Sequence, residues 1–110
     1  MTDRELLEAA AKAAGIPLEW DGNPRDWQPM YYKGKTYHAW NPLTDDGDAL
    51  RLAVRLNIGV MSAEYTGRTC AWLYCKGRDG EFFEPHGADP QAATRRAIVR
   101  AAAEIARAML

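Results

Sequence analysis

The chain has 110 residues, of which 47% are hydrophobic and 26% are charged, and its formal net charge is −1. This length fits one compact domain with its own core, and the composition is that of a folded chain rather than a disordered one. A charge so close to zero gives no overall field that would attract nucleic acid or anionic lipid. We therefore expect a single domain over 1–110, with no membrane binding and no sequence-specific recognition of nucleic acid.

Location and redox chemistry are constrained by what the sequence lacks. No apolar stretch is long enough to span a bilayer, and the first residues do not place a basic region before an apolar one, so a cytoplasmic protein is expected. Cys70 and Cys75 lie in one predicted strand, where their odd spacing points them to opposite faces and argues against a disulfide. No CxxC or HxxxH motif supplies a zinc site.

A short amphipathic helix is predicted from Asp3 to Ala14. Its apolar side chains recur at helical spacing, and Thr2 and Glu5 have the spacing of a capping box, in which each side chain binds the backbone N–H of the other residue. Gly15 is a typical helix stop, because glycine readily adopts the left-handed conformation that ends many helices.

The next segment, Ile16 to Pro29, is predicted to be irregular, because turn residues separate its two tryptophans. A β-hairpin is expected after it, from Gln28 to Trp40, with Lys33-Gly34 as the turn. In the returning strand, Tyr37 and Ala39 would face one side, and His38 and Trp40 the other.

An acidic joint, Trp40 to Leu52, connects the hairpin to a second predicted helix. The aspartates of this joint are Asp45, Asp46 and Asp48. Clustered carboxylates suit a hard cation, but the calcium-loop pattern needs ligands at alternating positions and a distal glutamate, which are absent here. Capping by Thr44 or Asp45, with the other carboxylates at the positive helix end, explains the cluster without a ligand. No metal site is predicted.

Two further helices are predicted, and each has an apolar stripe that would face the core. The first runs from Asp46 to Asn57, and the second begins at Asp89-Pro90, a cap followed by proline at the first helical position. The first stripe comprises Ala49, Leu52, Ala53 and Leu56, widened by Leu50 and Val54. The second stripe comprises Ile98, Ala101, Ala102, Ile105 and Met109.

Three strands are predicted between these helices, at Ile58 to Thr66, Thr69 to Lys76 and Glu81 to Glu84, with glycine-containing turns between them. The central strand is apolar on both faces, so helices are expected on one face and a partner on the other, which favours a homodimer. The element order αββαβββα predicts an α+β fold, in which three helices pack on a mainly antiparallel sheet of about four to five strands.

A basic stripe on the last helix consists of Arg96, Arg100 and Arg107, with Arg95 beside it. Guanidinium groups in such a row could bind phosphate bidentately. The alternative is a solvated face, supported by Arg100 and Glu104, which lie at the spacing of a helical ion pair. Both interpretations stay open at the level of the sequence.

No catalytic set is predicted, because neither His38 nor His86 has a nearby nucleophile in a suggestive sequence context, and no cofactor is expected. Aromatic residues could instead stack on bases or line a subunit contact, since flat rings serve both purposes. These aromatic residues are Trp40, Tyr65, Trp72, Tyr74 and Phe82.

Three segments carry a resemblance to a known family: Thr2 to Leu7, Trp40 to Val54 and Asp89 to Ile98. They resemble small uncharacterised proteins of tailed phages and prophages and, more distantly, the phage ABA sandwich domain. In that family an aromatic residue and a Ser/Thr-Asp helix start precede the first core helix, and an alanine-rich helix that carries arginine closes the chain. The resemblance implies a phage gene that acts inside a bacterial host, and it transfers no catalytic residue.

The first class of function that fits is a non-enzymatic accessory protein of the phage, acting in counter-defence by binding and sequestering a nucleotide signal of the host. Aromatic rings and guanidinium groups suit a nucleotide. The predicted ligand-binding residues are Trp40, Arg51, Arg95, Arg96 and Arg100. The alternative within this class is an inhibitor or adaptor that binds a host protein through an aromatic surface.

The second class of function is an enzyme, such as a small metal-dependent hydrolase that uses Asp45, Asp46 and Asp48 with His86. Such an enzyme needs an acid, a base and an activated nucleophile within reach of one another. Too few candidates for these roles make the enzyme the weaker hypothesis.

Overall fold

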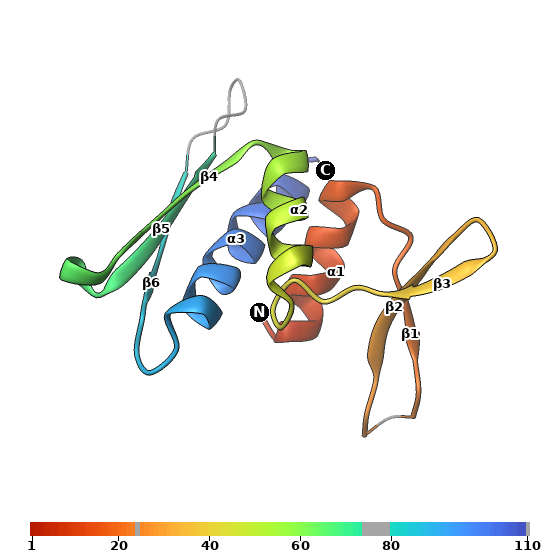
Figure 1. Cartoon of the computed structure of the whole chain (residues 1–110). Helices are drawn as coiled ribbons and strands as arrows, with labels where there is room; N and C mark the ends of the chain where they lie inside the picture. The colour runs from red at the N-terminus through yellow and green to blue at the C-terminus, as the bar shows by residue number, and fades with distance from the viewer. Residues whose placement is uncertain (24, 74–79, 110) are drawn as a thin grey trace.

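The computed structural model describes residues 1–23, 25–73 and 80–109, which form an α+β fold (Figure 1). The helices of this part of the chain are α1 (Asp3–Ala14), α2 (Asp46–Leu56) and α3 (Pro90–Arg107). One antiparallel sheet contains β1 (Glu19–Asp21), β2 (Gln28–Lys33) and β3 (Thr36–Ala39). A second antiparallel sheet contains β4 (Ile58–Ala63), β5 (Arg68–Leu73) and β6 (Glu81–Pro85).

The α+β class, the antiparallel pairing and the three helices are confirmed, but the strands differ from the prediction in number and grouping. Six strands lie in the described residues, in two separate sheets, where about four to five strands in one sheet were expected. The additional strand is β1, which lies in the segment predicted to be irregular and pairs with β2. Trp20 of β1 holds the first sheet against α1, because its indole N–H donates to Glu8 Oε1 at 3.1 Å.

Each helix begins at a side-chain cap that the sequence predicts. The capping box of α1 is confirmed, since the Thr2 hydroxyl and the Glu5 carboxylate each accept from the backbone N–H of the other residue at 3.1 Å. α2 and α3 are each capped by a single bond: the carboxylate of Asp45 accepts from the backbone N–H of Asp48, and that of Asp89 from the backbone N–H of Ala92. Gly15 ends α1 with a φ of 71°, in the left-handed region where glycine is unstrained.

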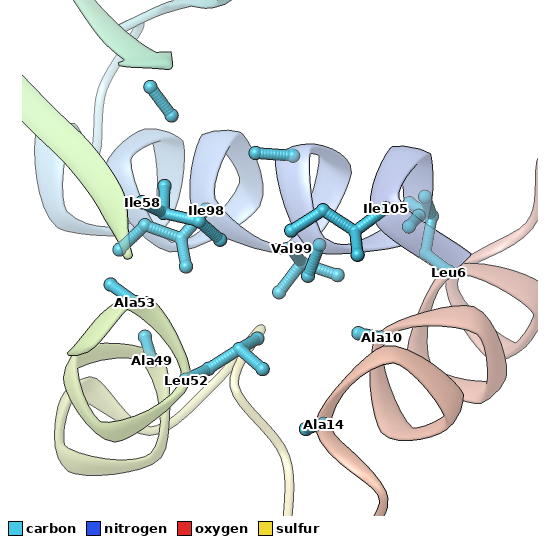
Figure 2. Packing of buried hydrophobic residues seen from close by; sticks show 14 of the residues in the cluster. Leu6, Ala10, Ala14, Ala49, Leu52, Ala53, Ile58, Ile98, Val99 and Ile105 are labelled. Atoms are coloured by element: carbon cyan, nitrogen blue, oxygen red, sulfur yellow. The ribbon is translucent and has the colours of Figure 1, made fainter. Parts of the chain in front are cut away.

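The core is built around α3, which lies between the β4–β6 sheet on one side and α1 and α2 on the other (Figures 1 and 2). Alanines on α3 let the neighbouring helices approach closely, because a methyl group occupies little of the space between helix axes. Ile98, Val99 and Ile105 fill the centre of this arrangement (Figure 2). None of the helices in these ranges combines the length and apolar character that crossing a bilayer requires.

Several predicted details are wrong. Leu50 and Val54 do not widen the buried stripe of α2, because 64% and 69% of their surfaces are exposed, and Met109 is half exposed beyond the end of α3. Glu64–Thr66, expected to extend a strand, forms a short 3-10 turn instead. The end of the predicted central strand, with Tyr74 and Cys75, lies outside the described residues.

Candidate functional site

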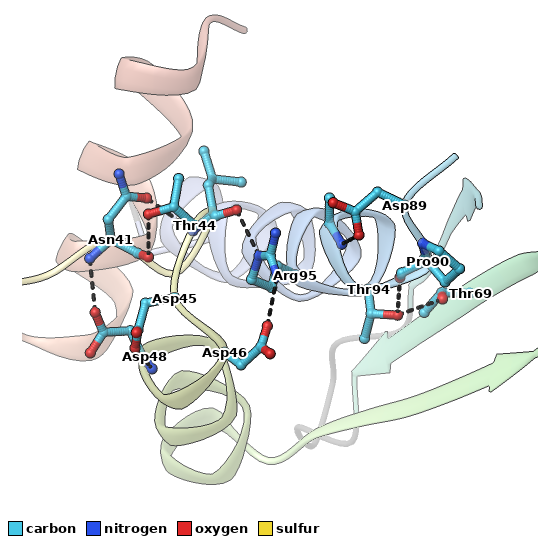
Figure 3. Close-up of polar contacts among 12 residues, drawn as sticks. Asn41, Thr44, Asp45, Asp46, Asp48, Thr69, Asp89, Pro90, Thr94 and Arg95 are labelled. Atoms are coloured by element: carbon cyan, nitrogen blue, oxygen red, sulfur yellow. Dashed lines mark hydrogen bonds and ion pairs between the residues drawn. The ribbon is translucent and has the colours of Figure 1, made fainter. Parts of the chain in front are cut away.

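The acidic joint before α2 is held by structural contacts, as the capping hypothesis predicts (Figure 3). Asp45 caps the helix, and Asp48 accepts from the backbone N–H of Asn41 at 3.0 Å and from Arg51 at 2.7 Å. Asp46 accepts from Arg95 at 2.6 Å. In the ranges that the structure describes, no group of three or more His, Cys, Asp or Glu residues is placed to bind a metal ion.

Arg95 of the predicted ligand set joins two distant parts of the chain. Its Nε donates to the carbonyl oxygen of Leu43 at 2.8 Å, while Nη1 binds Asp46 (Figure 3). Only 15% of the Arg95 side chain is exposed. Its donors therefore hold the joint between β3 and α2 against the first turns of α3, and they are not directed at a free anion.

Arg96 and Arg100 also bind partners within the chain. Arg96 Nη1 donates to Asp3 Oδ1 at 2.9 Å, which ties α3 to the start of α1. Arg100 Nη1 donates to Glu84 Oε1 at 2.9 Å and to the carbonyl oxygen of Phe83 at 3.0 Å, which ties α3 to β6. Arg96 and Arg100 of the basic stripe are thus engaged by carboxylates of other elements, whereas 74% of the Arg107 side chain is exposed.

The predicted pairing of Arg100 with Glu104 is not found. Glu104 instead binds Arg107, with Arg107 Nε at 2.9 Å from Glu104 Oε2. This contact lowers the pKa of Glu104, because the guanidinium hydrogen bond favours the charged carboxylate. Arg100 is drawn to Glu84 because β6 packs against α3 and brings that carboxylate over the helix.

Trp40 and Arg51, the other two predicted residues, do come together. Both line a cavity of about 590 Å³, which we call the α2 cavity, at the meeting point of the end of α1, the hairpin β2–β3 and α2. The remaining lining residues are Ala14, Gly15, Ile16, Pro17, Tyr31, Tyr32, Lys33, His38, Ala39, Asp48, Leu52 and Arg55. Arg95, Arg96 and Arg100 do not line this cavity.

The charge of the α2 cavity is positive. The positive charge of Arg51 is balanced by the carboxylate of Asp48, which accepts a hydrogen bond from it. This bond also raises the pKa of the guanidinium group. In the described part of the chain, neither Lys33 nor Arg55 has a carboxylate within ion-pair distance. The C-terminal end of α1 lies close to Arg55, since a methyl group built on Gly15 would lie 3.6 Å from Arg55 Nη2. The partial negative charge of that helix end attracts the guanidinium without neutralising it.

A flat aromatic pair borders the same cavity. The rings of Tyr31 and His38, which face each other across β2 and β3, are stacked with centroids 5.5 Å apart and planes 28° apart. Trp40 is buried, and its backbone N–H donates to the carbonyl oxygen of Pro29 at 3.0 Å. The buried Trp40 and the Tyr31–His38 pair thus both contribute to the wall of the cavity.

The sequence context of His86 suggested no nucleophile, and in the folded chain its Nε2 lies 3.0 Å from the hydroxyls of both Ser62 and Thr69. Each hydroxyl has a single proton to donate, and this fixes the direction of the hydrogen bonds around His86. Thr94 donates to the carbonyl oxygen of Pro90, so it accepts from Thr69, and the Thr69 hydroxyl must then accept from His86. With Nε2 carrying the proton, His86 cannot take a proton from Ser62 in this arrangement, so the pair lacks the geometry of a nucleophile and its base.

Lys33, Arg55 and the Tyr31–His38 pair line the α2 cavity but were not among the site residues predicted from the sequence. Arg55 follows Arg51 by four residues, a spacing that places both on one side of a helix and would have signalled its position. The Tyr31–His38 pair depends on hairpin register. A turn at Lys33-Gly34 would pair Tyr31 with Thr36, whereas the turn found, Gly34-Lys35, pairs it with His38.

Comparisons of the chain with protein-family models, with characterised proteins and with solved structures gave no match. The α2 cavity and its charges are therefore the features of this chain that bear on its function.

Proposed function

We propose that the protein is a non-enzymatic binding protein whose α2 cavity takes a nucleotide, that is, an anionic ligand with a planar aromatic ring. The volume of about 590 Å³ falls within the range of sites that enclose small molecules. Polar and apolar groups contribute to its wall in nearly equal measure, so charged side chains and aromatic rings face the same space.

The observation that carries this proposal is the coincidence of two unneutralised cations with a stacked aromatic pair in one cavity. Lys33 and Arg55 supply donors for a phosphate, and a guanidinium group can bind two phosphate oxygens at once. The Tyr31–His38 pair supplies a flat surface, on which a base is worth about 1–3 kcal/mol of stacking. The two chemistries of a nucleotide are thus matched by different walls of the α2 cavity.

A role in sequestration follows from the resemblance to phage proteins rather than from the cavity. In this proposal the protein is phage-encoded, is located in the host cytoplasm, forms a homo-oligomer and removes a nucleotide signal of host defence by binding it intact. No step of the proposal requires a metal ion or a covalent intermediate.

The test is titration calorimetry with a panel of cyclic and linear nucleotides and with orthophosphate, without divalent metal. Binding of a nucleotide is expected to be at least about tenfold tighter than binding of orthophosphate, because only the nucleotide uses the aromatic wall. Arg55→Gln should weaken nucleotide binding about tenfold or more, since it removes a charged hydrogen-bond donor. Arg107→Gln, an equal change of charge on α3 away from the cavity, is the matched control.

The outcomes separate the hypotheses. Equal affinity of the unaltered protein and Arg55→Gln for every nucleotide that binds would place the ligand elsewhere on the molecule. Absence of binding by the whole panel would remove the nucleotide proposal. Chromatography of the incubated nucleotide gives a further check, because recovery of a hydrolysed product would indicate an enzyme.

A further inference from the structure

The β4–β6 sheet has two different faces. Alternate residues of β5, beginning with Thr69, are buried against α3, while the intervening residues point to the opposite side. We call this opposite side the outer face. Among the described residues, no helix or strand packs on the outer face, and Figure 1 shows α3 on the other side of the sheet.

The strand register arranges the outer face in three rows. The middle row is Met61, Cys70 and Phe83, and it is apolar, with 56% of Met61 and 41% of Phe83 exposed. One end row is Gly59, Trp72 and Glu81, and the other is Ala63, Arg68 and Pro85. Each end row carries one charged residue, Glu81 or Arg68, so the exposed apolar row lies between two opposite charges.

Glycine at position 59 flattens the outer face. A methyl group built on Gly59 would lie 2.4 Å from Trp72 Cε2, so the indole ring occupies the space where a side chain of β4 would stand. The ring therefore lies down over the neighbouring strand. At the other end Arg68 extends over Phe83, with its guanidinium carbon 4.5 Å from the ring centroid. A flat sheet face of this kind can accept a second flat sheet face.

The charges of the outer face are complementary to themselves. Arg68 lies in one end row, and Glu81 lies in the other end row on the adjacent strand. Two copies can face each other about a two-fold axis that lies between their sheets, parallel to the middle row and perpendicular to the strands. Rotation about this axis places each end row opposite the other end row of the partner. It brings the partner's Glu81 to within one strand spacing of Arg68, and the reciprocal pair forms at the other end.

We propose that the outer face binds a second copy of this chain, sheet against sheet, about this two-fold axis. In the dimer each residue of the middle row meets its own counterpart, so Cys70 stands opposite the partner's Cys70. The apolar row loses its contact with water, and the Arg68–Glu81 pairs set the direction of one sheet relative to the other. This isologous arrangement needs only the surface that each copy already has.

The size of the outer face predicts a weak dimer. Three strands of five residues give a flat footprint on the order of 250 Å² per copy, against about 800 Å² per partner in a standard interface. Association should therefore depend on protein concentration between about 10 µM and about 1 mM. The α2 cavity lies on other elements, so this inference stands or falls independently of the nucleotide proposal.

The first test is sedimentation equilibrium of the full chain over that concentration range. The unaltered protein should dimerise, and Met61→Glu should be monomeric, because it places a charge against its own counterpart on the axis. Leu50→Glu is the matched control, since Leu50 is equally exposed but lies on α2, and it should dimerise normally. Dimerisation of Met61→Glu at the affinity of the unaltered protein would overturn the proposal.

A charge exchange tests the direction of packing. Arg68→Glu and Glu81→Arg should each weaken dimerisation several-fold, and the double variant should restore it, because the pairs re-form with reversed charges. Failure of the double variant to recover beyond the weaker single variant would contradict the two-fold arrangement.

Disulfide trapping tests the position of the axis. In a Cys75→Ser background, mild oxidation should link two chains through Cys70 at concentrations where dimer is present. Met61→Glu in the same background should abolish the crosslink. If the protein remains monomeric at about 1 mM and gives no crosslink, the outer face does not bind a second copy of this chain. The partner of the outer face would then be a different protein.

Discussion

The arginines of this chain differ in what they bind. Arg95, Arg96 and Arg100 each donate to an oxygen of another element, and these bonds hold α3 to its neighbours. Arg55 has no such carboxylate partner in the described residues and borders the α2 cavity. The sequence alone does not distinguish these roles, because Asp3 lies 93 positions from Arg96 and Glu84 lies 16 positions from Arg100, and only folding brings these partners together.

Glu5 makes the start of α1 sensitive to acid. Its hydrogen bonds with the backbone and side chain of Thr2 lower the pKa of the carboxyl group from the usual value of 4.5. A lowered pKa in the folded state means that the stabilisation is present above pH 4.5 and is lost as the pH falls through the folded-state value. The unaltered protein should therefore have a higher Tm than Glu5→Gln at neutral pH, and the difference should shrink in acid.

Thermal unfolding followed by circular dichroism between neutral pH and about pH 3 measures this difference. Thr2→Ala supplies a second variant, because it removes the hydroxyl from the same capping box and should cost about 1 kcal/mol at neutral pH. A Tm difference between the unaltered protein and Glu5→Gln that stays constant across the titration would show that charge on Glu5 does not contribute.

Helices and strands were predictable to different degrees. The start of each helix depends on a cap that acts within three or four residues, so Thr2, Asp45 and Asp89 mark the helix starts in the sequence itself. The predicted register of the β2–β3 hairpin was wrong because its turn was placed at Lys33-Gly34, one residue too early. This error changes the partner of every residue in the hairpin by two positions. That small shift hid the Tyr31–His38 wall of the α2 cavity.

One side chain of α3, that of Arg95, links this helix to the joint between β3 and α2. Arg95→Met keeps the aliphatic stem but removes both the bond to the Leu43 carbonyl and the ion pair with Asp46. Because the Leu43 carbonyl loses its charged donor, we expect a loss of about 1–3 kcal/mol in the free energy of unfolding. Urea denaturation monitored by tryptophan fluorescence measures it, since Trp40 lies beside the joint.

Arg107→Met is the control for this change. It lies on the same helix and also breaks an ion pair, but 74% of its side chain is exposed, so the expected change is within about 0.5 kcal/mol. Equal destabilisation by the two variants would mean that the Leu43 contact contributes no more than a surface ion pair.

At the scale of the whole molecule, the two sheets lie at opposite ends of a helical centre (Figure 1). Each sheet pairs only strands that are neighbours in the chain. The alternation of apolar and polar residues predicts such strands, but it does not show whether β1–β3 and β4–β6 form one sheet or two. The core residues belong mainly to the helices and to the β4–β6 sheet, while β1–β3 contribute few buried side chains.

Hydrogen exchange should reveal this unequal distribution. Amides in the centre of α3, surrounded by buried residues, should exchange slowest and by global unfolding. Amides of β1, a three-residue strand with mostly exposed side chains, should exchange through local opening at much lower free energy. Mass spectrometry of peptic peptides distinguishes the two, and equal protection of β1 and α3 would show that the β1–β3 sheet unfolds only together with the core.

The packing of α1 against α3 has a consequence for synthesis of the protein. The bond between Asp3 and Arg96 joins residues separated by 93 positions, so the first helix meets its main partner only when the last helix has left the ribosome. At about 5–20 residues per second, this leaves the apolar side of α1 exposed for roughly 5–20 s in each round of translation. Packing of the core is therefore a late event, because α1, α2 and the strands β4–β6 are all synthesised before the helix α3 that they pack against.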